Sequence, residues 1–415
     1  MKICFLQYSL AGGGAERKVC TLADYFASQG HDVEIGLFGK NIIKYDVSDK
    51  VKVTFIRRDT YQYNSVFEKA GFVIKRFLQN ALVYYPVWLV EIVLRCVHSS
   101  LIKKINHERV KQHFWKKNEY ISPIRNYIYN HKDSVFISMT VQCYLGIMEV
   151  MEKDFAEKRI DSPYIVMECS NPAIEVSGEV AKRRDRLYPM ASRIVTMTQG
   201  AKDFFNEDIR RICDVIPNPV RQDLPDPYIG DRRKVVVNYC RFHEAKNLPL
   251  LIKAFAMFVR DYPEYSLELY GEGDKKEEVE RLIAQLNIED SVQLLPFDPH
   301  IHERIKDCAM FVSSSDWEGF GNSILEALVM GLPVISTDCD FGPRDMITDH
   351  VNGLLVPVND THALYTAMKE VADDYMLADR ISHNAISART VFSAERIGNE
   401  WLHLLLDLSE KFYQE

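Results

Sequence analysis

Two glutamates and two basic residues in the second half of the chain have the types and the spacing to bind a nucleotide sugar. Glu318 and Glu326 lie eight positions apart in the segment EGFGNSILEA, and Arg241 precedes Lys246 by five positions. A carboxylate accepts two hydrogen bonds from a cis-diol, so one glutamate can hold a ribose and the other a hexose. Arginine and lysine supply the fixed positive charge that a diphosphate requires. The alternative interpretation is two solvated loops and one glutamate on a surface helix.

The residues around the two glutamates predict where each one lies. Residues 311–313 have the composition of a buried strand, and the apolar spacing over residues 324–329 predicts a helix. Gly319 and Gly321 interrupt the chain between these two elements. The loop can therefore fold Glu318 back over the N-terminus of the helix, where free backbone N–H groups favour a polar or anionic ligand.

The same order of strand, loop and helix recurs along the chain. Residues 2–8 predict a strand, which precedes the glycine-rich loop GGGAER and a helix over 18–29. In the second half a strand ends at Cys240, directly before Arg241. This alternation predicts an α/β protein with two facing, Rossmann-like, doubly wound domains, and the segment IPNPV around Asn218 predicts the crossing between them. The expected limits are 1–218 for the first domain, 219–397 for the second, and 398–415 for a helix that crosses back to the first.

Three segments closely resemble those of the retaining family 4 glycosyltransferases, of the bacterial surface-polysaccharide and lipid-linked oligosaccharide type. They are EGFGNSILEA with its Glu-x7-Glu spacing, the Arg-x4-Lys pair and the loop GGGAER. The resemblance implies the B-type glycosyltransferase fold, with the ligand in a cleft between two domains. It implies that Glu318 contacts the transferred sugar and Glu326 the ribose of the donor. It also implies that Arg241 and Lys246 clamp the diphosphate, so that these two residues and Glu318 are the expected catalytic residues. Further donor contacts are expected at Gly13, Gly14, Asn218, Gly271, Gly273, Phe297, Gly319, Phe320, Gly321 and Asn322.

The acceptor side of the pattern rests on two residues. Ser138, at the end of a predicted strand, and Glu168 are expected to contact an acceptor. Related enzymes tend to have an arginine after this acid, whereas this chain has Cys169. Glu168 therefore either orients an acceptor hydroxyl or pairs with a downstream arginine, and the candidates for that pairing are Arg183, Arg184 and Arg186.

The resemblance implies a metal-independent, retaining hexosyltransferase that uses no cofactor. It would move a hexose or N-acetylhexosamine from a nucleotide sugar, with UDP assumed from its frequency in the family, to a polyprenyl-diphosphate-linked glycan in surface polysaccharide biosynthesis. No carboxylate is an obvious double-displacement nucleophile, which favours attack on the face that the leaving group occupies. Two alternatives remain open: a UDP-sugar epimerase of the same fold, and a non-enzymatic membrane-surface protein that senses a nucleotide sugar.

The composition excludes other classes of protein. A formal net charge of −8 over 415 residues argues against nucleic-acid binding, which requires a basic face. Nine cysteines without a C-x2-C pair favour reduced thiols over disulfides or a zinc site. The start of the chain lacks the pattern of a secretory signal, so we expect a cytoplasmic protein.

A basic and aromatic segment, expected as a helical insert over about 60–117, interrupts the α/β pattern. Within it, Gly71–Lys117 contains nine lysines and arginines against Glu91 and Glu108, a balance of +7. Trp88 is of the residue type that prefers the headgroup level of a membrane. We expect this segment to hold the protein on the anionic inner face of the cell membrane. The alternative is a set of ordinary helices with solvated basic faces.

Overall fold

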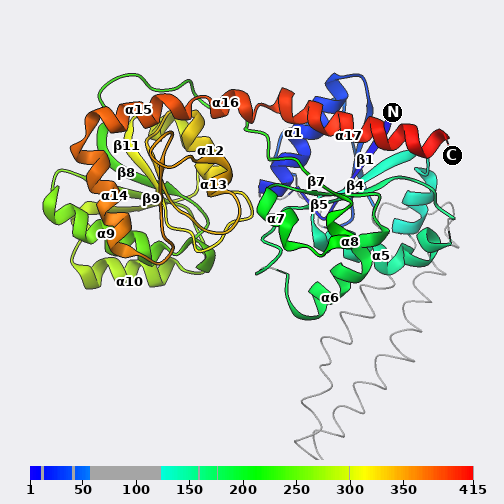
Figure 1. The fold of residues 1–415 in the computed structure, drawn as a ribbon, viewed down its shortest axis with the longest axis horizontal. Helices are drawn as coiled ribbons and strands as arrows, with labels where there is room; N and C mark the ends of the chain where they lie inside the picture. The colour runs from blue at the N-terminus through cyan, green and yellow to red at the C-terminus, as the bar shows by residue number, and fades with distance from the viewer. Residues whose placement is uncertain are drawn as a thin grey trace, which may run out of the picture.

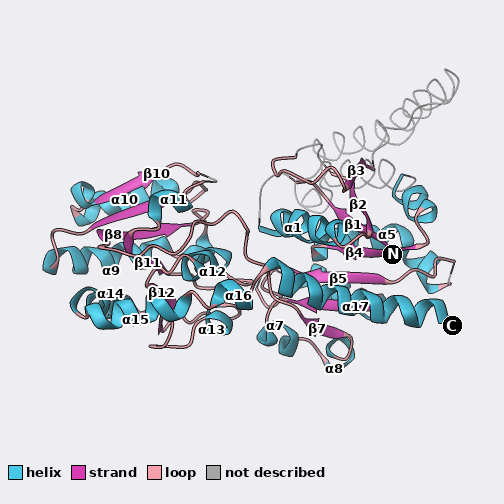
Figure 2. Cartoon of the chain, turned by 90° about the horizontal axis from the view of Figure 1, so that it is seen from above, coloured by secondary structure: helices cyan, strands magenta, loops and turns pink. Residues whose placement is uncertain are grey.

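The computed structural model describes residues 1–10, 14–39, 43–56, 123–157, 159–174, 176–298 and 300–414 of the chain. Two parallel β-sheets, each with helices on both faces, lie side by side (Figures 1 and 2). The predicted fold class of two facing Rossmann-like domains is confirmed. The predicted insert, its membrane-contact segment Gly71–Lys117, and Gly13 lie outside the described residues.

The first sheet has seven strands within the described residues, in the order β3-β2-β1-β4-β5-β6-β7. Each neighbouring pair is parallel, and β1 lies between β2 and β4 with Phe5 opposite both Ile35 and Ile137. The change of direction in strand order falls between β1 and β4, which is where a doubly wound sheet binds ligands at the carboxyl ends of its strands. The strands are β1 (Lys2–Gln7), β2 (Asp32–Leu37), β3 (Lys52–Phe55), β4 (Ser134–Ser138), β5 (Tyr164–Glu168), β6 (Arg193–Thr196) and β7 (Cys213–Val215).

The second sheet has six strands in the described part of the chain, in the order β10-β9-β8-β11-β12-β13, again with parallel pairs. Its change of direction falls between β8 and β11. The loops that follow these two strands therefore meet at one edge of the sheet. The strands are β8 (Arg233–Tyr239), β9 (Ser266–Tyr270), β10 (Val292–Leu295), β11 (Cys308–Ser313), β12 (Val334–Thr337) and β13 (Leu354–Val356).

Helices connect the strands of both sheets. Those of the first domain are α1 (Gly14–Ser28), a helix at 123–130, α5 (Val141–Ala156), α6 (Gly178–Leu187), the 3-10 turn η4 (Tyr188–Met190), α7 (Gln199–Phe204) and α8 (Glu207–Arg210). Those of the second begin with η5 (Glu244–Lys246), α9 (Leu248–Asp261), α10 (Lys276–Leu286), η6 (Glu289–Ser291), α11 (His302–Ile305) and α12 (Asn322–Val329). They continue with α13 (Pro343–Met346), α14 (Thr361–Asp373), α15 (Tyr375–Ala385), α16 (Ala388–Val391) and α17 (Ala394–Gln414).

Helix α1 begins earlier than its apolar spacing predicts. The structure starts the helix at Gly14, so that residues 14–17 of the predicted loop form its first turn. Glu16 lies in that turn, where a negative charge interacts favourably with the positive end of the helix dipole. Arg17 consequently projects from the first turn of a helix, beside Lys18, rather than from a loop.

The chain crosses between the domains twice, and the two crossings touch. The backbone N–H of Val220 donates to the carbonyl of Phe392 over 2.7 Å. After this point α17 runs back along the first domain beside α1 (Figure 1). Trp401 on α17 is fully buried there, and the hydroxyl of Tyr25 on α1 donates to the Asn399 side chain over 2.7 Å.

Candidate active site

A cleft of about 1410 Å³ lies between the two domains. Its wall on the first domain includes α1, and its wall on the second includes the loops after β8 and β11 and the start of α12. These are elements at the carboxyl ends of strands on either side of each change of direction, where the fold is expected to bind a ligand. The three predicted catalytic residues, Arg241, Lys246 and Glu318, all line this cleft.

Lys246 and Glu318 form an ion pair in the cleft. The Nζ of Lys246 lies 2.5 Å from Oε1 of Glu318, and the hydroxyl of Ser315 donates to the same oxygen over 2.7 Å. Burial alone would lower the pKa of Lys246, but the adjacent Glu318 carboxylate raises the pKa above its ordinary value. The lysine is therefore charged at neutral pH and held in one place, as the binding of an anionic leaving group requires.

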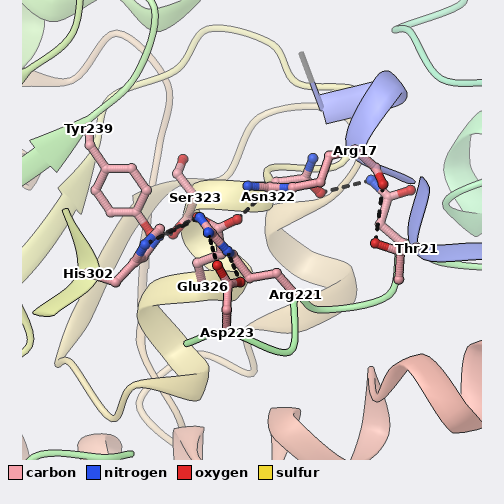
Figure 3. Close-up of polar contacts among 10 residues, drawn as sticks. Arg17, Thr21, Arg221, Asp223, Tyr239, His302, Asn322, Ser323 and Glu326 are labelled. Carbon is pink, nitrogen blue, oxygen red and sulfur yellow. Dashed lines mark hydrogen bonds and ion pairs between the residues drawn. The ribbon is translucent and has the colours of Figure 1, made fainter. Parts of the chain in front are cut away.

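Glu326, on the buried side of α12, accepts hydrogen bonds from both domains (Figure 3). Arg17 of α1 donates through Nη2 to Oε1 over 2.5 Å, and Nε2 of His302 lies 2.9 Å from Oε2. Burial would raise the pKa of Glu326, but the bond with His302 and the charge of Arg17 lower it below its usual value. Arg221, which is ion-paired with Asp223, adds to this effect from the crossing segment. Glu326 is therefore a buried, ionised acceptor.

The start of α12 is shaped by a glycine and an asparagine. Gly321 precedes the helix with φ of 95°, a left-handed conformation that glycine adopts readily. Asn322 is the first helical residue, and its Oδ1 accepts from Nδ2 of Asn218 over 2.8 Å. Gly14 faces it so closely that an added Cβ would lie 2.7 Å from the Asn322 amide nitrogen. Glycine at position 14 thus permits contact between the domains.

Lys18 extends this polar contact into the first domain. Its Nζ donates to Oδ1 of Asn218 over 2.6 Å, and the side chain is buried. Burial lowers the pKa of Lys18 to about 8, with a small opposing effect from Cys169. A hydrogen-bonded chain, Lys18 to Asn218 to Asn322, therefore joins α1 to α12.

The other predicted donor residues fall into two groups. Arg241 and Phe297 are exposed on the cleft wall, the latter by 69%, and Gly319 and Phe320 also line the cleft. The remaining two are glycines that do not line the cleft. Gly271 and Gly273 have φ of 153° and 158°, and an added Cβ would lie 1.9 Å from the Cys240 carbonyl oxygen or 2.1 Å from that of Phe242. These two glycines therefore allow the loop after β9 to pack against the backbone on either side of Arg241.

The predicted acceptor residues are buried away from the cleft. The hydroxyl of Ser138 is hydrogen-bonded to that of Tyr164 over 2.6 Å. Glu168 accepts from the Tyr188 hydroxyl over 2.7 Å and from Ser170, and burial raises its pKa. The three arginines that were candidates to pair with Glu168 form ion pairs with other carboxylates. The pairs are Arg183 with Glu149, Arg184 with Asp185, and Arg186 with Glu152. Neither residue lines the cleft, so their expected contact with an acceptor stays a prediction.

Several cleft residues were not foreseen from the sequence. Arg17 and Lys18 come at the end of the glycine-rich segment and at the start of a helix. This position could have indicated a role in ligand binding, because a helix N-terminus that follows a strand favours anions such as phosphates. The approach of Arg221 and His302 to Glu326 has no counterpart in the sequence pattern.

The described residues were also searched for metal sites and for membrane-spanning helices. Within the described ranges, no group of three or more histidines, cysteines or acidic residues is arranged to hold a metal ion. An Asp-x-Asp pattern does follow β12, but Asp338 is ion-paired with Arg344, and neither Asp338 nor Asp340 lines the cleft. In the described part of the chain, helices that combine the length and apolarity needed to span a bilayer are absent.

Two facing Rossmann-like domains, with glutamates and basic residues lining the cleft between them, are the arrangement of the B-type glycosyltransferase fold. Residues 221–388 match the family described as glycosyl transferases group 1. The match covers the second domain, and the fold of both domains is that of the B-type glycosyltransferases.

Three known proteins illustrate the similarity. The N-acetylgalactosamine-N,N'-diacetylbacillosaminyl-diphospho-undecaprenol 4-alpha-N-acetylgalactosaminyltransferase of Campylobacter jejuni is 27% identical over 66% of this chain and 76% of its own length. From the same organism, the GalNAc-alpha-(1->4)-GalNAc-alpha-(1->3)-diNAcBac-PP-undecaprenol alpha-1,4-N-acetyl-D-galactosaminyltransferase is 22% identical over 98% of this chain and 99% of its own. The crystal structure of Anabaena HepE in complex with UDP superposes with a TM-score of 0.71 at 18% identity, covering 98% of this chain and 100% of HepE. With some other curated relatives, this chain spans less than half of the relative's length.

Proposed function

We propose that the protein is a retaining glycosyltransferase that moves a hexose or N-acetylhexosamine from a UDP-sugar to a polyprenyl-diphosphate-linked glycan. The observation that carries this proposal is the arrangement around the Lys246–Glu318 ion pair, with Arg241 and Glu326 lining the same cleft. The names of the two Campylobacter relatives support a lipid-linked acceptor, and the HepE complex supports UDP.

The cations of the cleft suit the departure of a nucleoside diphosphate. As the sugar–phosphate bond breaks, negative charge develops on the leaving oxygens, and Lys246 and Arg241 lie on the cleft to stabilise it. Glu318 keeps Lys246 in place and lies where a sugar hydroxyl can donate to it. Because these charges are part of the protein, we propose that transfer needs no divalent metal ion.

The carboxylates of the cleft favour attack on the same face as the leaving group. Glu318 is engaged by Lys246, and Glu326 is engaged by Arg17 and His302. A carboxylate held by a cation is a poor nucleophile toward the sugar, so a covalent glycosyl-enzyme is disfavoured. We propose that the acceptor hydroxyl attacks the anomeric carbon directly, while the leaving phosphate takes its proton.

The proposed place of action is the inner face of the cell membrane, with the protein as a peripheral component. This part of the proposal rests on the sequence of Gly71–Lys117, whose balance of +7 would attract it to anionic lipid.

The test combines purified protein with UDP-glucose, UDP-galactose, UDP-GlcNAc or UDP-GalNAc, with and without a polyprenyl-diphosphate-linked glycan. We expect one donor to be consumed rapidly only when the acceptor is present, and the NMR spectrum of the product to show the donor's anomeric configuration. The Glu318→Gln variant should lose this transfer. Interconversion of the sugars without acceptor would instead indicate an epimerase, and an inverted linkage would refute the retaining mechanism.

A further inference from the structure

The carboxylate of Glu326 is fixed from both sides of the cleft. One oxygen, Oε1, accepts from Arg17 of the first domain, and the other, Oε2, is bonded to His302 of the second (Figure 3). The side chains of Glu326 and His302 are each 6% exposed, while that of Arg17 is 28% exposed. A carboxylate with a different partner on each oxygen has a single preferred orientation, since rotation would break both bonds.

This arrangement leaves acceptor capacity on both oxygens. A carboxylate offers about four lone-pair sites, and the two bonds use one site on each oxygen. Tyr239 also lies nearby: its hydroxyl donates to the Ser323 carbonyl over 2.9 Å and interacts with the Glu326 carboxylate. A cis-diol presents two hydroxyl groups about 3 Å apart, which matches the two oxygens of a carboxylate in this state.

The position of Arg17 is itself fixed against the second domain. Lys18, the next residue on α1, is bonded through Asn218 to Asn322, four residues before Glu326 on α12. The close approach of Gly14 to Asn322 holds the first turn of α1 against the start of α12. The guanidinium of Arg17 therefore meets Glu326 in a set geometry rather than as a mobile surface charge.

We propose that Arg17 is a positioning residue that gives the donor site its preference for a ribose cis-diol. It does so by holding Glu326 from the first domain, in the orientation that receives the 2′- and 3′-hydroxyls. This inference rests on the proposed function, in which Glu326 binds the ribose, and it adds a first-domain residue to a subsite built otherwise from the second domain.

The competing explanation is a contact that only holds the two domains together. The positioning role and the domain-contact role predict different effects of an Arg17 substitution on the affinity for a nucleotide without the 2′-hydroxyl. A domain contact affects binding of UDP and 2′-deoxy-UDP equally, because both use the same diphosphate and base subsites. A residue that orients Glu326 affects the binding of UDP more than that of 2′-deoxy-UDP, because only UDP presents the complete diol.

The experiment measures the dissociation constants of UDP and 2′-deoxy-UDP by calorimetry for the full-length protein and its variants. For the wild-type protein we expect UDP to bind about 10-fold or more tightly than 2′-deoxy-UDP, as for one hydrogen bond to a charged group. Arg17→Gln should reduce that ratio to a value near that of Glu326→Gln, while the affinity for 2′-deoxy-UDP stays within about twofold. Arg17→Lys, which keeps the charge but not the fork, should give an intermediate ratio.

The matched control is Arg281→Gln, which removes an exposed arginine on α10 whose Nε donates to a backbone carbonyl of its own helix. It should leave the ratio unchanged.

Unchanged 2′-deoxy-UDP binding also shows that a variant is folded. An unaltered ratio in Arg17→Gln and Arg17→Lys, or an equal loss of both nucleotides, would overturn the inference. A wild-type protein that transfers sugar without preferring UDP over 2′-deoxy-UDP would refute the diol role of Glu326, and this inference with it, while leaving the proposed reaction intact. A wild-type protein that binds neither nucleotide would refute the proposed donor as well.

Discussion

Removing Lys246 and removing Arg241 should have the same effect on catalysis and different effects on stability. Each variant, Lys246→Ala and Arg241→Ala, takes one cation away from the developing diphosphate charge. Loss of one such stabilising group costs about 100-fold to 1000-fold in rate in other enzymes. We therefore expect either substitution to lower the rate of sugar transfer by that factor.

The free energy of unfolding separates the two variants. Arg241 is exposed, so its replacement should change the free energy of unfolding by less than about 0.5 kcal/mol. Lys246 is the cation of a pair whose acid, Glu318, is 7% exposed, and its loss leaves that carboxylate with the Ser315 hydroxyl. Breaking a buried pair costs about 3–5 kcal/mol. Since 23% of the Lys246 side chain remains exposed, the lower end, about 3 kcal/mol, is the expected loss.

Urea unfolding and a transfer assay on the same preparations test this reasoning. The double variant Lys246→Ala/Glu318→Ala should recover much of the lost stability, because no unpaired charge is then buried, and should recover none of the activity. A near-wild-type rate in either single variant would refute the proposal that Arg241 and Lys246 stabilise the leaving diphosphate. Equal stability of the two single variants would show that the Lys246–Glu318 pair is solvated.

Three further predictions concern metal, membrane and pH. Transfer should continue in EDTA, since the cleft carries its own cations, and activity lost in EDTA and restored by Mn2+ would contradict this. Binding to anionic vesicles should fall with salt, and also when four residues of the basic segment are changed to glutamate, while transfer to a short soluble acceptor is spared; these residues are Lys75, Arg76, Lys103 and Lys104. Equal co-sedimentation at low salt would refute membrane contact through this segment. Lys18 has a folded-state pKa near 8 against an ordinary 10.5, so above pH 8 the folded protein releases a proton that the unfolded chain still holds. The stability of the wild type relative to Lys18→Met should therefore rise between pH 8 and 10.5, and a constant difference would refute the buried, shifted lysine.

The fold could be predicted because its strands are short apolar runs bounded by loop residues. The strand predicted over residues 2–8 is β1, Lys2–Gln7, and the strand predicted to end at Cys240 is β8, which ends at Tyr239. The positions of Glu318 in a loop and Glu326 inside a helix were also predictable, since glycines mark the loop and apolar spacing marks the helix. Local patterns were sufficient for both.

The direction in which a side chain points is harder to predict from the sequence. Ser138 and Glu168 end strands at the correct edge of the sheet, but their side chains are buried beside Tyr164 and Tyr188. Successive strand residues point to opposite faces, and a shift of one residue decides between ligand and core. No periodic signal in a buried parallel strand distinguishes the two, because both of its faces are apolar.

The contacts of Glu326 could not be predicted for a different reason. Arg17 lies 309 positions earlier in the chain and His302 lies 24 positions earlier. Arg17 meets the carboxylate only because two separately folded sheets are placed edge to edge. Such a contact depends on the relative position of the domains, which the composition and spacing of single segments do not encode.

The return of α17 to the first domain affects the order in which the protein folds on the ribosome. Helix α1 is made at the start of translation, yet the surface of this domain that buries Trp401 and Leu405 has no partner until residues beyond 393 emerge. The second domain has all of its strands by then. While the second domain folds, the first domain therefore still exposes the apolar surface that α17 will cover. Such a surface is prone to aggregation and attracts chaperones. The first domain is the first to begin folding and the last to finish.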